Sequence, residues 1–168
     1  MRILTTHLEL VALTAGDADD LFPVLDDPAL GRFTGDDPPV SVESLRGRFA
    51  VWAGRRSPEG DELWLNWVVR RRADGRAVGY VQATVGADDA AIAWVVGSAF
   101  QRQGIATEAG AALMAWLHDA LGVSVLNGRI HPEHVASQTV AARIGLRPTD
   151  RRYDGEVVWT DAPAPPGS

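Results

Sequence analysis

The sequence predicts a single α+β domain built around one mixed, mostly antiparallel sheet, and three observations carry this prediction. A chain of 168 residues with 46% hydrophobic residues suits one domain with a sizeable core rather than two. Between residues 63 and 96 the apolar residues form short strand-like runs joined by turns. Beyond residue 105 their spacing becomes helical. A meander followed by a helix, a strand, a helix and a hairpin is an α+β order around one sheet.

The chain is expected to begin with a strand and two short helices. Residues 7–13 alternate like an opening strand. Either Thr14 or Asp17 then caps a short helix, and after a proline-containing loop at 35–39, Ser41 caps a second one. The apolar residues carried by these two helices are Leu21, Phe22, Leu25, Leu45, Phe49 and Trp52.

An antiparallel meander of three strands is expected next, at residues 63–69, 78–85 and 90–96. Residues 72–76 join the first two strands and contain an Asp-Gly pair, which is the signature of a tight hairpin turn. The third strand continues the sheet directly into the segment that carries the most chemical information.

A long helix at residues 106–121 follows, and Gly122 stands at its usual C-terminal stop. Its helically spaced apolar residues are Ala106, Ala109, Leu113, Trp116, Leu117 and Ala120. A strand at 123–130, a helix at 136–144 and a hairpin over 146–160 complete the domain. The elements then add up to about seven strands and about four helices in one domain at residues 1–160. Residues 161–168 are rich in proline and alanine, which predicts a flexible tail.

The composition excludes several classes of protein. All basic residues are arginine and there is no cysteine, so a P-loop lysine, a Schiff-base lysine, a disulfide framework and a thiolate nucleophile are absent. A net charge of −6 argues against a general nucleic-acid binder. No apolar run is long enough to span a membrane and no secretion signal is recognisable, so a cytoplasmic protein is expected.

The turn at residues 101–106, Gln-Arg-Gln-Gly-Ile-Ala, lies between a strand and a helix that begins with small residues. Unpaired N–H groups and the positive end of the helix dipole make such a turn an anion site, and Arg102 adds a charge. An ordinary strand-to-helix connection is the alternative interpretation. The turn matches neither a Walker loop nor a dinucleotide fingerprint.

Three segments in the correct order resemble the GCN5-related N-acetyltransferase (GNAT) superfamily over residues 5 to 160. Gln101, Gly104 and Ala106 fit its signature turn, Gln/Arg-x-x-Gly-x-Gly/Ala. Residues 131–146 are similar to its Asn-x-x-Ser…Gly-Phe segment, with His134 in place of the asparagine. The opening residues resemble the branch that contains the ribosomal-protein alanine and serine N-terminal acetyltransferases.

The resemblance implies acetyl-CoA as cosubstrate, without a metal, bound where the central sheet is splayed. The turn at 101–107 would hold the pyrophosphate, and the strand ending at Val96 would pair with the pantetheine arm. The residues implied in cofactor binding are Trp94, Val95, Val96, Gln101, Arg102, Gln103, Gly104, Ile105, Ala106, Thr107, His134 and Ser137. An extended arm that carries amides can indeed add itself to the edge of a strand.

Catalysis in this family is direct transfer from the thioester to an amine, which needs an oxyanion donor, an acid and a base. The resemblance implies the backbone N–H of Val96 as the oxyanion donor. The tyrosine that serves many relatives as the acid is replaced by Ala141, so Ser137 is the substitute, although it alternatively only decorates its helix. Glu156, Glu108 and a chain of waters remain the alternatives for the base.

The acceptor is expected to be a primary amine, either a protein N-terminus or a small molecule. The acidic loop at 36–39 falls where relatives form the acceptor wall, although it is alternatively only an acidic surface loop. Trp64 and Trp67 face opposite sides of one strand, so one enters the core and the other is a candidate for the acceptor cleft. Trp52, Trp94 and Trp116 are assigned to the core. A homodimer is compatible with the family, and the competing function is an acyl-CoA sensor without turnover.

Overall fold

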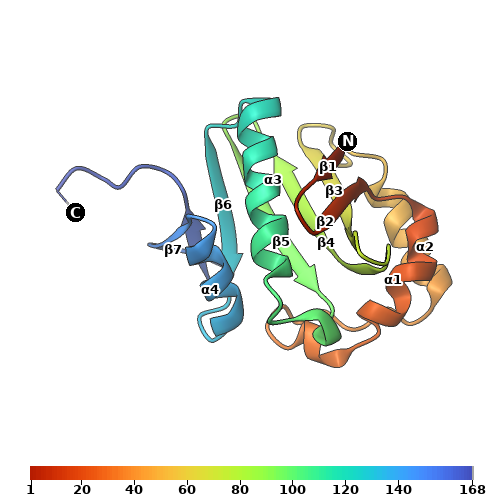
Figure 1. Cartoon of the computed structure of the whole chain (residues 1–168). Helices are drawn as coiled ribbons and strands as arrows, with labels where there is room; N and C mark the ends of the chain where they lie inside the picture. The colour runs from red at the N-terminus through yellow and green to blue at the C-terminus, as the bar shows by residue number, and fades with distance from the viewer. Residues whose placement is uncertain (168) are drawn as a thin grey trace.

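The computed structural model describes residues 1–167, which form a sheet of eight strands and four α-helices (Figure 1). The strands are β1 Arg2–Leu4, β2 Leu8–Ala12, β3 Leu63–Arg71, β4 Ala77–Val85, β5 Asp89–Val96, β6 Val125–Ile130, β7 Arg147–Tyr153 and β8 Glu156–Thr160. The helices are α1 Ala18–Leu25, α2 Val42–Trp52, α3 Ile105–Leu121 and α4 Val135–Arg143, and three short 3-10 turns accompany them. The predicted α+β class is therefore confirmed.

The sheet has the order β1-β2-β3-β4-β5-β6-β8-β7 and is antiparallel at every pairing except one. Only β5 and β6 run parallel, and their register covers just Asp89–Ala91 against Val125–Asn127. Beyond that point the two strands diverge toward the end of the sheet at which α3 begins (Figure 1). The expected splay is thus present, because a short parallel ladder is all that joins the two halves of the sheet.

Each face of the sheet carries its own core. The larger core lies between the sheet and α3 and includes Trp67, Leu113, Leu117 and Ala141, all almost completely buried. The second lies under α1 and α2 and includes Leu21 and Phe49 together with residues of the sheet. Burial of this much apolar surface is the main force that holds the helices on the sheet.

Most of the predicted turns and caps agree with the structure. The Ser41 hydroxyl accepts a hydrogen bond from the Ser44 N–H at 3.0 Å and so caps α2. In the 3-10 turn Ala15–Asp17 that leads into α1, the Asp17 carboxylate accepts from the Thr14 N–H at 2.7 Å, but neither side chain caps α1 itself. Gly122 ends α3 with φ +66°, and the last hairpin turns at Asp154 and Gly155 with φ +49° and +82°.

Two expectations need correction. The eighth strand, β1, was not predicted, because three residues are too few to show a hydrophobic period. Its pairing with β2 stabilises it. The expectation that one tryptophan of β3 enters the core is met by Trp67, whose ring centroid lies 5.3 Å from that of Trp116, whereas Trp64 donates to Glu62 at 3.3 Å. Trp52 was assigned to the core, but it lies at the end of α2 and also lines a surface cavity.

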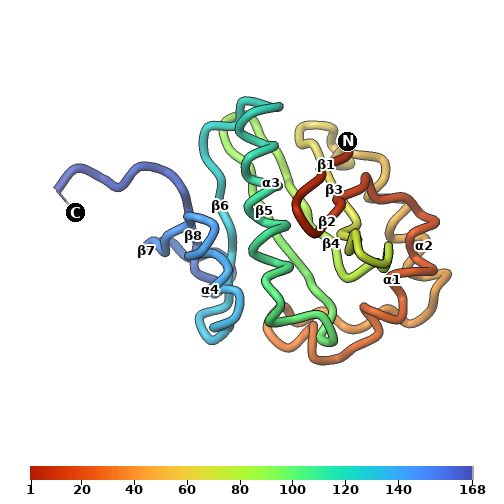
Figure 2. Tube along the Cα trace, in the orientation of Figure 1, coloured from red at the N-terminus to blue at the C-terminus, as the bar shows by residue number. Residues whose placement is uncertain are grey.

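Beyond β8 the chain extends away from the sheet (Figure 2). Its first two residues are hydrogen bonded to the domain: the Asp161 carboxylate accepts from the Leu126 N–H at 2.7 Å, and the Ala162 carbonyl accepts from Arg147. Residues 163–167 are exposed. The division into a domain at 1–160 and a tail at 161–168 stays a prediction, and its last residue, Ser168, lies outside the described residues.

Within residues 1–167, none of the helices combines the length and the apolar character that crossing a membrane requires.

Candidate active site

The divergence of β5 from β6 leaves one edge of β5 without a neighbouring strand. β6 pairs with Asp89–Ala91 and then continues against β8 alone, from Asn127 to Ile130. The last part of β5, Ile92–Val96, therefore has β4 on one side and an unpaired edge on the other. An extended ligand that carries amides can complete this edge with backbone hydrogen bonds.

The alternation along β5 decides which backbone groups face this edge. The Gly97 N–H donates to the Val78 carbonyl at 2.9 Å, so residue 97 is paired with β4. Successive residues of a strand direct their N–H and C=O groups to opposite sides. Val96 and Trp94 consequently direct their backbone groups toward the unpaired edge, whereas Val95 directs its groups toward β4.

The turn between β5 and α3 is exposed at Gln101–Gly104. Gly104 adopts φ +79° as the residue before the helix, a conformation that glycine adopts without strain. The first helical bond runs from the Glu108 N–H to the Gly104 carbonyl at 3.0 Å, so the N–H groups of Ile105, Ala106 and Thr107 have no partner inside the helix. This end of α3 can accept an anion through its backbone.

Gln101 differs from the simple expectation for a phosphate-binding residue. Its side-chain amide donates to the Val96 carbonyl at 3.0 Å, and so it ties the end of β5 to the start of the turn. Arg102 is exposed and has φ +62°. Of these two side chains, only that of Arg102 projects freely enough to meet an anion.

Across the divergence, α4 follows β6 and brings His134 and Ser137 to the same end of the sheet. The Ser137 hydroxyl lies 3.4 Å from Nε2 of His134. Phe33, from the loop between α1 and α2, stacks on the His134 ring with the centroids 4.4 Å apart. Burial lowers the pKa of His134 and the electrostatic effect of nearby His131 lowers it further, so the imidazole is neutral at pH 7.

Ala141 occupies the position of the missing tyrosine and is completely buried in the main core. Its backbone carbonyl accepts from the Leu146 N–H at 2.9 Å, at the end of α4. A tyrosine side chain would have to displace packed neighbours here, because a filled core resists extra volume.

The two candidate carboxylates have different surroundings. Glu108 accepts hydrogen bonds from the Thr5 hydroxyl and the His7 N–H, and it pairs with the His7 ring at 3.0 Å. Burial raises the pKa of Glu108, but these hydrogen bonds outweigh burial and leave the pKa below its usual value. Glu108 therefore anchors the turn between β1 and β2 to α3, which leaves it poorly suited to accept a proton from a substrate.

Glu156 opens β8, and its neighbour Val157 pairs with Ile130 at the end of β6. Since β5 and β6 are parallel, Glu156 lies at the end of the sheet that also holds Val96 and Ser137. It is half-buried, and within residues 1–167 it forms no ion pair. Its carboxylate is therefore available to other groups.

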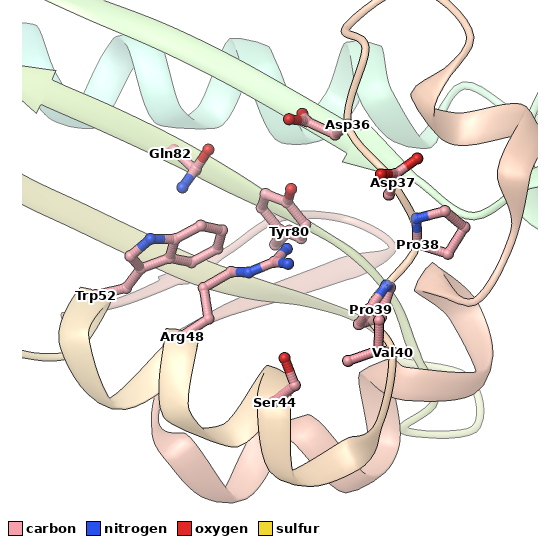
Figure 3. Close-up of a pocket in the computed structure, with 10 residues that line it drawn as sticks. All are labelled: Asp36, Asp37, Pro38, Pro39, Val40, Ser44, Arg48, Trp52, Tyr80 and Gln82. Carbon is pink, nitrogen blue, oxygen red and sulfur yellow. The ribbon is translucent and has the colours of Figure 1, made fainter.

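A cavity of about 430 Å³ lies under α2, on the face of β4 opposite the one that α3 covers (Figure 3). Its lining residues are Asp36, Asp37, Pro38, Pro39, Val40, Ser44, Arg48, Trp52, Tyr80 and Gln82. Tyr80 and Gln82 belong to β4 and pair with Val95 and Ala93 of β5, so the cavity is one strand away from the unpaired edge. The acidic loop predicted at 36–39 does form part of its wall.

Several residues of this region were missed in the sequence. Phe33, Arg48, Tyr80 and Gln82 come from three separate parts of the chain, the loop after α1, α2 and β4, and no motif marks any of them. The only available signal was the phase of β4, because its polar side chains at Tyr80 and Gln82 alternate with buried Val81 and Ala83.

Comparisons with known proteins agree with the geometry. A family model described as an acetyltransferase (GNAT) domain matches residues 7–147. No curated protein matches the chain. A GNAT-family acetyltransferase from Bacillus anthracis has a similar structure, with TM-score 0.77, 16% identity, and coverage of 95% of this chain and 97% of that one.

Two further structures are similar over most of their length. One is RimJ of Mycobacterium smegmatis in complex with CoA-disulfide, with TM-score 0.76, 23% identity, and coverage of 91% of this chain and 80% of that one. The other is the ribosomal-protein-S5-alanine acetyltransferase of Vibrio fischeri, with TM-score 0.75, 14% identity and 95% coverage of both chains. At these identities the likeness concerns the fold.

Proposed function

Because the chain belongs to the GNAT acetyltransferase family, we propose that it transfers an acetyl group from acetyl-CoA directly to a primary amine. The observation that carries this proposal is the unpaired edge of β5 next to the exposed turn at 101–104 that leads into α3. One surface thus offers a backbone edge for an extended arm and backbone N–H groups for phosphates. The similarity to RimJ, whose structure contains CoA-disulfide, supports the same ligand class.

Acetyl-CoA would bind largely through the backbone. The pyrophosphate would accept hydrogen bonds from the N–H groups at 104–107, with Arg102 as the added positive charge. The pantetheine amides would pair with the backbone of Trp94 along the unpaired edge, because the Val96 carbonyl already accepts from Gln101 and the Val96 N–H faces the thioester oxygen. His134 and Ser137 on α4 would flank the arm from the other side of the divergence.

The reaction would follow direct transfer in a ternary complex. The neutral amine nitrogen attacks the thioester carbon, a C–N bond forms, and the carbonyl oxygen becomes an oxyanion that accepts from the Val96 N–H. The C–S bond then breaks with its electron pair on sulfur. The Ser137 hydroxyl protonates the leaving thiolate, Glu156 or a chain of waters takes the proton from nitrogen, and solvent returns a proton from the base to Ser137. The neutral His134 ring would orient the Ser137 hydroxyl.

The acceptor would enter from the cavity under α2, where Asp36 and Asp37 favour an ammonium group. A protein N-terminus and a small amine both fit this requirement. The name of the Vibrio fischeri neighbour, a ribosomal-protein-S5-alanine acetyltransferase, is a reason to include an N-terminal alanine among the acceptors tested. A cytoplasmic location, a homodimer, and the absence of nucleic-acid and membrane partners stay predictions.

The alternative function is a sensor that binds acyl-CoA without turnover, and the buried Ala141 in place of the usual acid favours it. A thiol-release assay with acetyl-CoA distinguishes the two functions, using peptides that begin with alanine or serine, spermidine and an aminoglycoside. Thiol release that depends on an amine supports the enzyme. Saturable binding of acetyl-CoA without release on any amine would support the sensor, and no binding would contradict both.

A further inference from the structure

The cavity under α2 carries opposite charges on its two walls. Asp36 and Asp37 stand on the loop that follows Phe33, and Arg48 projects from α2 on the other wall (Figure 3). The Tyr80 ring lies between Arg48 and Asp36 in this view, with its hydroxyl directed toward Asp36. The two charges are thus held apart by an aromatic surface.

These charged groups are not satisfied by the protein itself. Within residues 1–167, the guanidinium of Arg48 forms no ion pair, whereas its neighbour Arg46 pairs with Asp19 at 2.8 Å and with Glu43 at 3.3 Å. The carboxylates of Asp36 and Asp37 also have no ion-pair partner among these residues. Opposite charges on one cavity that do not pair with each other are available to a ligand.

The charges on both walls affect the pKa of Tyr80. Burial raises the pKa of Tyr80 to about 12, with the negative charge of Asp36 acting in the same direction and the positive charge of Arg48 opposing it. The phenol is therefore neutral at pH 7, and its ring adds no charge between the two walls. Trp52 lies 5.6 Å from Tyr80, centroid to centroid, and extends this aromatic surface toward α2.

The acidic wall is the one suited to the reacting amine. Tyr80 and Gln82 pair with Val95 and Ala93, so the floor of the cavity is one strand from the edge that ends at Val96. Figure 3 shows Asp36 and Asp37 on the same loop, on the opposite side of the cavity from Trp52. A molecule whose ammonium lies at Asp36 and Asp37 would extend across Tyr80 to Arg48.

We propose that the acceptor carries an anionic group in addition to its amine, with Arg48 as its anchor, so that this cavity selects zwitterionic amines over simple cations. This inference rests on the proposed function for the identity of the reacting group. The anion is a carboxylate, which the planar guanidinium can bind through two hydrogen bonds. A cavity of about 430 Å³ falls in the range of small-molecule sites.

Calorimetric binding in the presence of CoA tests the proposal without requiring turnover. The probes are 4-(aminomethyl)benzoate and its carboxamide, together with 6-aminohexanoate and its carboxamide, at low salt. Within each pair the amine and the spacer are the same and only the anion differs. We expect the wild-type protein to bind at least one carboxylate about tenfold more tightly than its carboxamide, and Arg48→Gln to reduce that ratio to about twofold or less.

Arg46→Gln is the matched control, because Arg46 lies two residues away on the same helix but forms its own ion pairs. It should keep the preference of the wild type. The double variant Asp36→Asn, Asp37→Asn should weaken both members of a pair alike, since it removes only the ammonium partner.

Equal binding within both pairs, no measurable binding of any probe, or the same loss in Arg46→Gln as in Arg48→Gln would overturn the proposal. Failure of the proposed function has a different signature, because it leaves these affinities intact and abolishes thiol release. The two failures are therefore separated by one calorimetric and one kinetic measurement.

Discussion

The two sides of the proposed reaction centre are built from different parts of the chain. The side suited to acetyl-CoA is a continuous stretch, from Trp94 through the turn to Thr107, and it offers mainly backbone groups. The cavity suited to the acceptor is assembled from the loop at 36–40, α2 and β4, and it offers side chains. A continuous backbone site is set by local conformation, whereas a side-chain site depends on how distant elements pack.

This difference predicts whether a substitution should affect acetyl-CoA binding and the chemical step or the binding of the acceptor. Changes in the turn or in α4 should alter the handling of acetyl-CoA or the chemical step and leave acceptor binding intact. Changes in α2 or its facing loop should do the reverse. The following predictions test this separation, beginning with the largest effect.

Ser137→Ala should lower kcat about a hundredfold, because it removes the proposed proton donor for the leaving thiolate. The KM for acetyl-CoA should stay within about twofold, since most contacts to the cofactor come from the backbone. Steady-state kinetics on the most active amine measures both values. Thr139→Ala is the control, because Thr139 is exposed on the same helix and its hydroxyl donates to the Val135 carbonyl at 3.0 Å. An unchanged kcat in Ser137→Ala would remove this residue from the mechanism.

Gly104→Val should weaken acetyl-CoA binding about tenfold, because a branched side chain at φ +79° strains the turn by about 1–3 kcal/mol. The matched control is Gly60→Val, since Gly60 has φ +78° and similarly open surroundings but lies in the loop before β3. Calorimetry with acetyl-CoA should separate the two variants. Similar affinities in both would mean that the conformation of this turn does not determine cofactor binding.

Glu108→Gln should destabilise the protein by about 1–2 kcal/mol at pH 7 while leaving kcat nearly unchanged. The pKa of Glu108 is lowered in the folded state, so its contribution is present above its ordinary pKa of 4.5 and is lost as the pH falls through the folded value. Urea unfolding between pH 3 and pH 7 should show a smaller loss of stability on acidification in the variant. Asp119→Asn, an exposed acid on the same helix, is the control. A large fall in kcat would restore Glu108 as a candidate base.

His118→Asn should have the smallest effect, under about 1 kcal/mol, because the ring is partly exposed. Nδ1 faces the Val123 carbonyl at 2.6 Å and Nε2 faces the Asp161 carboxylate at 2.8 Å, and only the protonated ring donates to both. The Val123 carbonyl, with Asp161 after it, raises the pKa of His118 above 6.5.

The stabilisation from His118 should therefore be complete below pH 6.5 and disappear as the pH rises through the raised pKa. Thermal unfolding of the wild type and the variant at pH 5.5 and pH 8.5 measures this difference. A Tm difference between the two proteins that is larger at pH 8.5 would contradict the assignment. Thiol release should be the same in both proteins, because His118 lies near the far end of α3 from the turn.

Much of the fold was predictable because its signals are local. The Asp-Gly pair at 154–155 predicted the last hairpin, and the caps at Ser41 and Gly122 set the ends of α2 and α3. These features depend on residues a few positions apart. The short strand β1 carried no such signal, since its place in the sheet comes from pairing with β2.

The same distinction applies to the candidate site. The turn at 101–106 and the positions of His134 and Ser137 could be recognised from a motif because each lies within one segment. The stacking of Phe33 on His134 joins residues about a hundred positions apart in the chain, and no local sequence pattern predicts it. The assignment of Trp52 to the core was incomplete for the same reason, since only the packing of α2 on β4 reveals the cavity beside it.

The sequence by itself determined the α+β class, the order of the elements other than β1, the absence of lysine and cysteine chemistry, and the strand–turn–helix segment proposed to bind acetyl-CoA. The reason is that periodicity, helix caps and backbone turns depend on residues that are close together in the sequence. The tertiary structure alone decided that Glu108 is an anchor, that Trp52 and Tyr80 form an aromatic surface, and that Arg48 lies across one cavity from two carboxylates. These assignments depend on distances between elements that are far apart in the chain, and such distances exist only once the sheet and its two cores have formed.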